Sequence, residues 1–110
     1  MSSNPLVSVI TPTFNRADYL PYAVESVLSQ SVPDFELIVI DDGSTDGTAE
    51  LMERYLADSR IRYLKQENQG QSVARNRGIA EALGQFICFL DSDNAWVSTK
   101  LETSLKAFEE

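Results

Sequence analysis

Two carboxylates one residue apart follow an apolar stretch of the chain. Residues 86–90 read FICFL, and Asp91 and Asp93 come directly after them on either side of Ser92. A stretch this apolar predicts a strand buried on both faces of a parallel sheet, so the two carboxylates would lie at its carboxyl end, where open α/β sheets bind ligands. Carboxylate oxygens on a tight turn suit Mg²⁺ or Mn²⁺, and such ions seldom bind without a phosphate partner. The spacing therefore indicates a metal-assisted site for a nucleotide diphosphate.

Two further polar clusters each follow an expected strand. Residues 11–15 (TPTFN) come after a β-branched strand at 6–10, and residues 41–44 (DDGS) come after an apolar strand at 35–40. Because the strands of a parallel sheet end at the same rim, these clusters and residues 91–94 would open on one side. Each cluster alone is also what an ordinary polar turn contains. The three together favour a ligand site.

A cation and an aromatic ring could complete such a site. Arg75, early in a helix expected at 72–83, could contact phosphate or could lie on a solvated helix face. Phe14 could stack on a base or pack in the core. A carboxylate and a phosphate oxygen about 4 Å apart repel by roughly 1 kcal/mol in water and roughly 4 kcal/mol at an effective dielectric near 20. The sequence has no glycine-rich phosphate loop, so the acidic pair predicts a divalent ion between itself and the diphosphate.

The composition excludes several other classes of protein. The chain has 110 residues, a formal net charge of −8 and no histidine. The negative charge argues against nucleic acid as a partner, and the missing histidine excludes Ser-His-Asp and Cys-His catalysis as well as histidine-ligated zinc. The single cysteine, Cys88, allows no internal disulfide and is expected to be a buried structural thiol. No apolar run approaches the length of a membrane span, and we expect one cytoplasmic domain over residues 1–110.

The expected elements follow the order β-α-β-α-β-α-β-α. Short right-handed connections favour a three-layer α/β/α fold, Rossmann-like, with a mainly parallel sheet. Pro12 is expected to end the first strand, because it cannot join the ladder of a central strand. Gly78 in the third helix indicates close packing on the sheet. The expected strands are 6–10, 35–40, 61–64 and 86–90. The first two expected helices are 19–30, capped by Asp18, and one after Gly47 with Ala49, Met52, Tyr55 and Leu56 on one side. The last two are 72–83, with Val73, Ala80 and Leu83 on one face, and one from Thr99, which forms a capping box with Glu102 and places Leu101, Leu105 and Phe108 on one stripe.

The polar clusters also resemble the motifs of a known family. Residues 7–15 (VSVITPTFN), 40–46 (IDDGSTD), 68–78 (NQGQSVARNRG) and 90–93 (LDSD) look like the motifs of family 2 glycosyltransferases, which are nucleotide-diphospho-sugar transferases of the GT-A fold. The four motifs occur in the right order and span nearly the whole chain. The resemblance implies the sheet order 3-2-1-4, which places the first and fourth strands side by side.

The resemblance further implies a role for each matching residue. Asp93, together with Asp91, would ligate Mn²⁺ or Mg²⁺. Asn94 stands where many members have another acid, and this loss of a charge could alter the affinity for the metal. The residues that would contact the donor nucleotide are Pro12 and Phe14 (nucleobase pocket), Asp42 (hydrogen bond to the base, usually uracil), Arg75 (nucleotide), and Asp91 and Ser92 (ribose and diphosphate).

The implied reaction is transfer of a sugar, with inversion, from an NDP-sugar, usually a UDP-sugar, to a hydroxyl of a glycan, lipid or other acceptor. The family's acceptor half and catalytic base lie further along than Glu110, so the chain resembles an N-terminal donor-binding half and is expected to catalyse little alone. Exposed apolar surface would then favour self-association, and any membrane contact would come from other parts of a longer protein. Two alternatives are a receiver-type signalling domain, which would carry its acids after the first and third strands, and a non-catalytic nucleotide-binding module.

Overall fold

Strands and helices alternate along the described part of the chain. The computed structural model describes residues 4–96 and 98–109, of which 108 and 109 are described by their backbone alone. The elements are β1 (Val7–Thr13), α1 (Leu20–Leu28), β2 (Phe35–Asp41), α2 (Thr48–Glu53), β3 (Ile61–Lys65), α3 (Gln71–Glu81), β4 (Phe86–Phe89) and α4 (Lys100–Glu109). All pairs of neighbouring strands are parallel, in the order β3-β2-β1-β4. The predicted α/β class and strand order are therefore confirmed.

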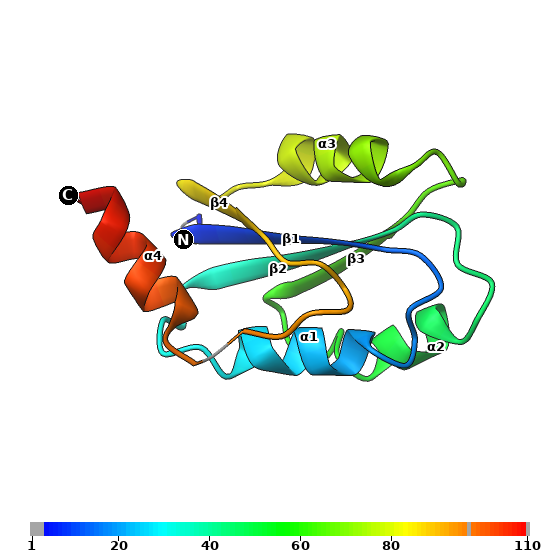
Figure 1. Cartoon of the computed structure of the whole chain (residues 1–110), viewed down its shortest axis with the longest axis horizontal. Helices are drawn as coiled ribbons and strands as arrows, with labels where there is room; N and C mark the ends of the chain where they lie inside the picture. The colour runs from blue at the N-terminus through cyan, green and yellow to red at the C-terminus, as the bar shows by residue number, and fades with distance from the viewer. Residues whose placement is uncertain (1–3, 97, 110) are drawn as a thin grey trace.

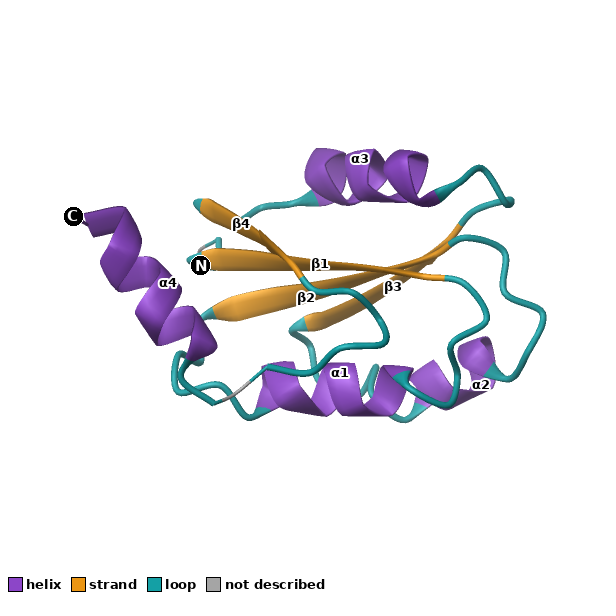
Figure 2. Cartoon of the chain, viewed as in Figure 1, coloured by secondary structure: helices purple, strands orange, loops and turns teal. Residues whose placement is uncertain are grey.

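The sheet lies between two layers of helices (Figures 1 and 2). α3 covers one face of the sheet, and α1 and α2 cover the other. α4 lies near the amino-terminal ends of β1 and β2 (Figure 1). There Leu101 is fully buried, and its backbone N–H donates to Gln30 Oε1 at 2.8 Å. Gln30 thus satisfies one of the backbone donors that a helix leaves free in its first turn.

The two central strands supply most of the core, because every residue of β1 and β2 is buried. Successive side chains of a strand point to opposite faces, so the core has two parts. Val9 and Val39 belong to the cluster that includes Val24 of α1. Ile38 and Ile40 pack with Ala74 of α3 on the other face. The near-continuous apolar runs of the two strands reflect this burial on both sides.

The prediction that Pro12 ends the first strand is wrong, because β1 continues to Thr13. Thr13 O accepts the N–H of Asp42 on the β2 side at 2.9 Å, whereas Ile10 O accepts the N–H of Leu90 on the β4 side at 3.0 Å. Hydrogen bonds of a central parallel strand alternate between its two neighbours, so Pro12 faces the β4 side. The ladder with β4 has its last pair at Ile10 and Phe89. Pro12 lies beyond this pair, so its lack of an N–H group removes no hydrogen bond from the ladder.

The inner face of the third helix also differs from the prediction. Ala74 and Gly78 are the buried residues of α3, while Val73 and Leu83, expected on the inner face, are 40% and 54% exposed. Ala80 is exposed as well. A Cβ added at Gly78 would lie 2.4 Å from Ile10 Cγ2. The helix thus approaches the sheet through the small residues Ala74 and Gly78, which confirms the close packing expected at Gly78 and turns the larger side chains outward.

β4 is half-exposed, although its sequence predicted burial on both faces. The strand order places β4 at one edge of the described sheet. Ile87 is 37% exposed and Phe89 is 45% exposed, whereas Cys88 on the opposite face packs against the core. An apolar run alone does not distinguish a strand buried on both faces from an edge strand with one exposed face.

The first two helices differ from the prediction at their ends. α1 begins at Leu20, and Tyr19 rather than Asp18 occupies the N-cap position, with no side-chain cap bond. The N–H of Leu20 donates instead to Arg16 O at 2.8 Å. α2 is short, and Leu56, expected on its inner side, lies beyond the helix and is 42% exposed.

The last helix begins at Lys100, directly after Thr99, as predicted. Leu101 is buried and Leu105 packs against the core, whereas the side chain of Phe108 lies outside the described residues. Within residues 4–96 and 98–109, every helix is too short or too polar to cross a bilayer.

Candidate nucleotide-sugar site

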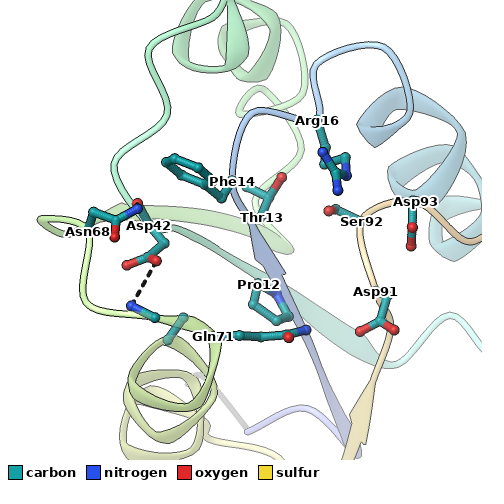
Figure 3. A pocket seen from close by; sticks show the side chains of 12 residues that line it. Pro12, Thr13, Phe14, Arg16, Asp42, Asn68, Gln71, Asp91, Ser92 and Asp93 are labelled. Atoms are coloured by element: carbon teal, nitrogen blue, oxygen red, sulfur yellow. Dashed lines mark hydrogen bonds between the residues drawn. The ribbon is translucent and has the colours of Figure 1, made fainter.

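An open crevice of about 560 Å³ lies at the carboxyl ends of β1, β2 and β4 (Figure 3). It brings together all the residues predicted to contact a nucleotide or a metal except Arg75. Their individual roles stay predictions, but their common location is the one that the three polar clusters indicated. The lining residues are Pro12, Thr13, Phe14, Arg16, Asp42, Asn68, Gly70, Gln71, Ala74, Asp91, Ser92 and Asp93.

The crevice opens because the strands have different lengths. β1 pairs with β2 as far as Thr13 and Asp41, whereas its pairing with β4 ends at Ile10 and Phe89. Beyond that point the segments that continue β1 and β4 separate, and Pro12 lines the crevice between them. Topological switch points of open α/β sheets are where such folds bind ligands.

Asp42 anchors the loop between β3 and α3 beside the crevice. The residue is 5% exposed, and its carboxylate accepts hydrogen bonds from Gln66 Nε2 at 2.9 Å and from the N–H groups of Gln69 at 2.8 Å and Gly70 at 3.0 Å. The bond to Gly70 is drawn in Figure 3. Gly70 has a φ of 100°, which favours glycine. A carboxylate has about four acceptor positions, so Asp42 retains one for a ligand.

The pKa of the Asp42 carboxyl group lies below its usual value. Burial acts to raise this pKa, but the hydrogen bonds from Gln66, Gln69 and Gly70 outweigh it. Asp42 is therefore ionised at neutral pH. An ionised carboxylate only accepts hydrogen bonds, and this selects a ligand that presents an N–H or O–H group.

Arg75 does not line the crevice but contacts Asp91, which does. Its Nη2 atom lies 3.4 Å from Asp91 Oδ1, and the two side chains are 40% and 45% exposed. A pair this exposed stabilises the fold by only about 0–1 kcal/mol. The guanidinium carbon lies 6.0 Å from the centroid of the Phe89 ring. Arg75 thus lies beside the crevice, in contact with a carboxylate that lines it.

Asp91 and Asp93 could supply part of the coordination shell of a divalent ion. Both line the crevice (Figure 3), and Asp93 is exposed. In the part of the chain that the structure describes, no three His, Cys, Asp or Glu side chains gather to hold an ion on their own. Mg²⁺ in particular often binds through one or two carboxylates, water and substrate phosphates. The donor set therefore fits an ion whose remaining ligands come from a diphosphate.

Sequence reasoning gave no role to four polar side chains that line the crevice. Arg16 follows the first polar cluster directly, and this adjacency was the available signal. Asn68 donates to Asp42 O at 3.2 Å, and Gln71 begins α3. Thr13 is 3% exposed, and its buried hydroxyl has no hydrogen-bond partner among the described residues.

Cys88 lies outside the crevice and is half-buried against the core. Burial raises the pKa of its thiol, and the nearby charge of Lys100 opposes this effect only in part. A raised pKa disfavours the reactive thiolate. This agrees with the structural role predicted for Cys88.

Residues 8–110 match the family model described as Glycosyl transferase family 2. The chain belongs to this family, and its four-stranded sheet with flanking helices is a GT-A fold. The resemblance of the polar motifs predicted both.

Curated relatives are glycosyltransferases of bacteria. TuaG of Bacillus subtilis (strain 168), provisionally assigned to teichuronic acid biosynthesis, is 50% identical over 105 residues, which cover 93% of this chain and 41% of TuaG. Glycosyltransferase GlyG of Streptococcus pneumoniae is 38% identical over 107 residues, which cover 96% of this chain and 36% of GlyG. The chain thus spans well under half the length of these relatives.

Solved structures show the same architecture. TarS of S. aureus, residues 1–349 in complex with UDP, has a TM-score of 0.87 and 30% identity over 94% of this chain and 32% of its own. The mannosyltransferase PcManGT of Pyrobaculum calidifontis, in complex with GDP-Man and Mn²⁺, has a TM-score of 0.77 and 28% identity over 86% of this chain and 29% of its own.

Proposed function

We propose that this chain binds the nucleotide-sugar donor of a metal-dependent, inverting glycosyltransferase, with a UDP-sugar as the donor. The observation that carries the proposal is that Asp42, Asp91 and Asp93 line one crevice together with Phe14. The structural neighbour TarS was solved with UDP and with UDP-GlcNAc, and PcManGT with GDP-Man and Mn²⁺. These complexes support a nucleotide diphosphate as the ligand and a divalent ion that binds together with it.

The crevice residues fit distinct parts of such a donor. Phe14 is 43% exposed, so its ring is accessible for stacking on a base. The ionised Asp42 could accept a hydrogen bond from a base N–H, as uracil offers. Asp93 and Asp91 would hold Mn²⁺ or Mg²⁺, which when bound neutralises charge on the leaving diphosphate.

In the proposed reaction an acceptor hydroxyl attacks the anomeric carbon on the face opposite the diphosphate. A bond forms between the acceptor oxygen and the anomeric carbon, and the bond from that carbon to the phosphate oxygen breaks. The electron pair leaves with the diphosphate, the acceptor proton passes to a general base, and the anomeric centre inverts. Because the matched relatives are more than twice as long as this chain, we assign it donor binding and assign none of its residues as the base.

Calorimetric titration of UDP tests the proposal. With Mn²⁺ present we expect measurable binding, and with a chelator or in Asp93→Asn the affinity should fall by about tenfold or more, since a carboxylate and a phosphate repel without a bridging ion. Asp34→Asn is the matched control, because Asp34 is exposed and precedes β2 at the opposite end of the sheet. Equal UDP affinity of the wild type with Mn²⁺, the wild type with a chelator, Asp93→Asn and Asp34→Asn would contradict the proposed function.

We further propose that the chain associates with itself through its exposed apolar surface. Ile87 and Phe89 on β4 and Val73, Ile79 and Leu83 on or beside α3 are exposed. Ile87 and Phe89 pair in register with Ser8 and Ile10. Because Ile10 lies against Gly78 of α3 and paired residues point to the same face of a sheet, Ile87 and Phe89 lie on the α3 side. Large apolar patches on soluble proteins usually mark contact surfaces.

Light scattering over a concentration series tests this association. We expect the wild-type chain to dimerise or assemble further as its concentration rises, and Phe89→Thr to shift that transition to a concentration at least several-fold higher. Leu56→Thr is the control, because Leu56 is 42% exposed but lies beyond α2. A wild-type chain that stays monomeric throughout, or equal association of Phe89→Thr and Leu56→Thr, would show the proposal to be wrong.

A further inference from the structure

Arg16 supplies a guanidinium that lines the crevice, and within residues 4–96 and 98–109 it makes no ion pair of the kind that occupies three other arginines. Arg75 pairs with Asp91, Arg60 with Asp58, and Arg62 with both Glu36 and Glu81. Among the described residues, Arg16 has no such carboxylate partner. Its guanidinium makes one long hydrogen bond, from Nη1 to the carbonyl oxygen of Asn15 at 3.4 Å. The side chain is therefore available to a ligand.

The backbone on both sides of Arg16 is fixed by the loop that follows β2. Asn15 has a φ of 51°, its N–H donates to Ser44 Oγ at 2.9 Å, and its Oδ1 accepts the N–H of Thr45 at 2.8 Å. The N–H of Ala17 donates to Asp46 Oδ2 at 3.1 Å. A non-glycine residue at positive φ is uncommon outside Asn and Asp. These contacts hold the Cα atom of Arg16 in place, so only its side chain has to be ordered when a ligand binds.

Arg16 lies on the side of the crevice where the diphosphate is expected. Figure 3 shows its side chain directed toward the edge formed by Ser92 and Asp93. The other charged side chains that line the crevice, Asp42, Asp91 and Asp93, are all acidic. At about 4 Å, a unit positive charge attracts a phosphate oxygen by roughly 1 kcal/mol in water and roughly 4 kcal/mol at an effective dielectric near 20. Guanidinium groups also match two phosphate oxygens at once.

We propose that Arg16 contacts the diphosphate of the donor directly, and that Arg75, which the sequence indicated for the nucleotide, positions Asp91. This inference rests on the proposed function, because it assigns a contact within the same donor site. It goes beyond that function by naming a cation of this chain, in addition to a divalent ion, that would contact the diphosphate. Arg16 thereby distinguishes a nucleoside diphosphate from its nucleoside.

Titrations of UDP and of uridine, followed by amide chemical shifts in the presence of Mg²⁺, test the inference. We expect Arg16→Gln to weaken UDP binding by about tenfold and to leave uridine binding unchanged, with Arg16→Lys between wild type and Arg16→Gln for UDP. Arg54→Gln is the matched control for the loss of one positive charge, because Arg54 follows α2 and does not line the crevice. Arg54→Gln should bind both ligands as the wild type does.

Two results would overturn the inference and leave the proposed function standing. One is UDP affinity in Arg16→Gln equal to that of Arg54→Gln. The other is an equal loss of UDP and uridine affinity in Arg16→Gln, since that would show a change in the base site or in the fold. A wild-type chain that binds no UDP at all would overturn the proposed function and this inference together.

Discussion

Gly78→Ala is expected to lower the free energy of unfolding by about 2 kcal/mol, the range for over-packing a core. The added Cβ would lie 2.4 Å from Ile10 Cγ2 and 3.2 Å from both Ile10 Cγ1 and Cδ1. This contact outweighs the gain of about 1 kcal/mol that alanine normally brings to a helix interior. α3 also carries Gln71 and Ala74, which line the crevice, so its displacement should weaken UDP binding. Urea denaturation curves give the change in stability.

A double-mutant cycle makes this prediction specific. Ile10→Ala alone should cost about 2–5 kcal/mol, as large-to-small core substitutions do. In that background Gly78→Ala should become neutral or stabilising by up to about 1 kcal/mol, because the clashing atoms are gone. Gly47→Ala is the control, since no atom of the described residues lies within 4 Å of a Cβ built there, and it should cost about 1 kcal/mol or less. If Gly78→Ala lowered the free energy of unfolding equally in the wild-type and Ile10→Ala backgrounds, the close contact would be refuted.

Asp42→Ala is expected to destabilise the chain by about 3 kcal/mol and to abolish measurable UDP binding. Three hydrogen bonds from Gln66, Gln69 and Gly70 end on the Asp42 carboxylate. A hydrogen bond to a charged group contributes roughly 1.5–3 kcal/mol net of the exchange with water, and bonds that share one acceptor group do not add up fully. Their loss would release the loop that borders the crevice. Asp58→Ala is the control, because Asp58 pairs with Arg60 at a site where the two side chains are 31% and 36% exposed, and it should cost about 1 kcal/mol or less.

The contribution of Asp42 should also depend on pH. Its pKa in the folded chain is lower than in the unfolded chain, so its stabilisation is complete above the unfolded pKa, about 3.9, and is lost as the pH falls through the folded value. The stability difference between wild type and Asp42→Asn should therefore be constant from pH 7 to pH 5 and shrink below about pH 4. Urea midpoints at pH 7, 5 and 3 measure it. A difference that grows as the pH falls would contradict the role of the ionised carboxylate.

The architecture could be predicted from the sequence because it depends on local patterns. The apolar runs of β1 and β2 and the polar residues that end them lie within a few positions of each other. Parallel pairing then places Asp42 and Asp91 on one rim whatever the details of packing. The four motifs added the strand order, which periodicity alone does not contain.

The errors arose where the answer depends on distant partners. Pro12 fits inside β1 only because β4 ends earlier, which no local rule can show. The half-exposed β4 depends on its place at the edge of the described sheet. On α3, a preference for large apolar side chains selected Val73 and Leu83, whereas the close approach to Ile10 required the small residues Ala74 and Gly78.

The site shows the same division between local and distant information. The acidic residues stand out in sequence, because carboxylates at strand ends are a strong pattern. The pairing of Arg75 with Asp91 and the unpaired state of Arg16 depend on contacts between separate segments. Sequence reasoning therefore predicted most of the residues that line the crevice, whereas the phosphate contact that we propose for Arg16 depends on contacts between distant segments.

In the proposed site, a divalent ion at Asp91 and Asp93 joins a negatively charged crevice to a negatively charged donor. Paramagnetic broadening of amide signals by substoichiometric Mn²⁺ tests it most directly. With UDP present, we expect selective broadening at residues 91–93 and at Phe14, and we expect Asp93→Asn to abolish it. Broadening that is absent with UDP, or that centres on residues away from the crevice and persists in Asp93→Asn, would contradict the account.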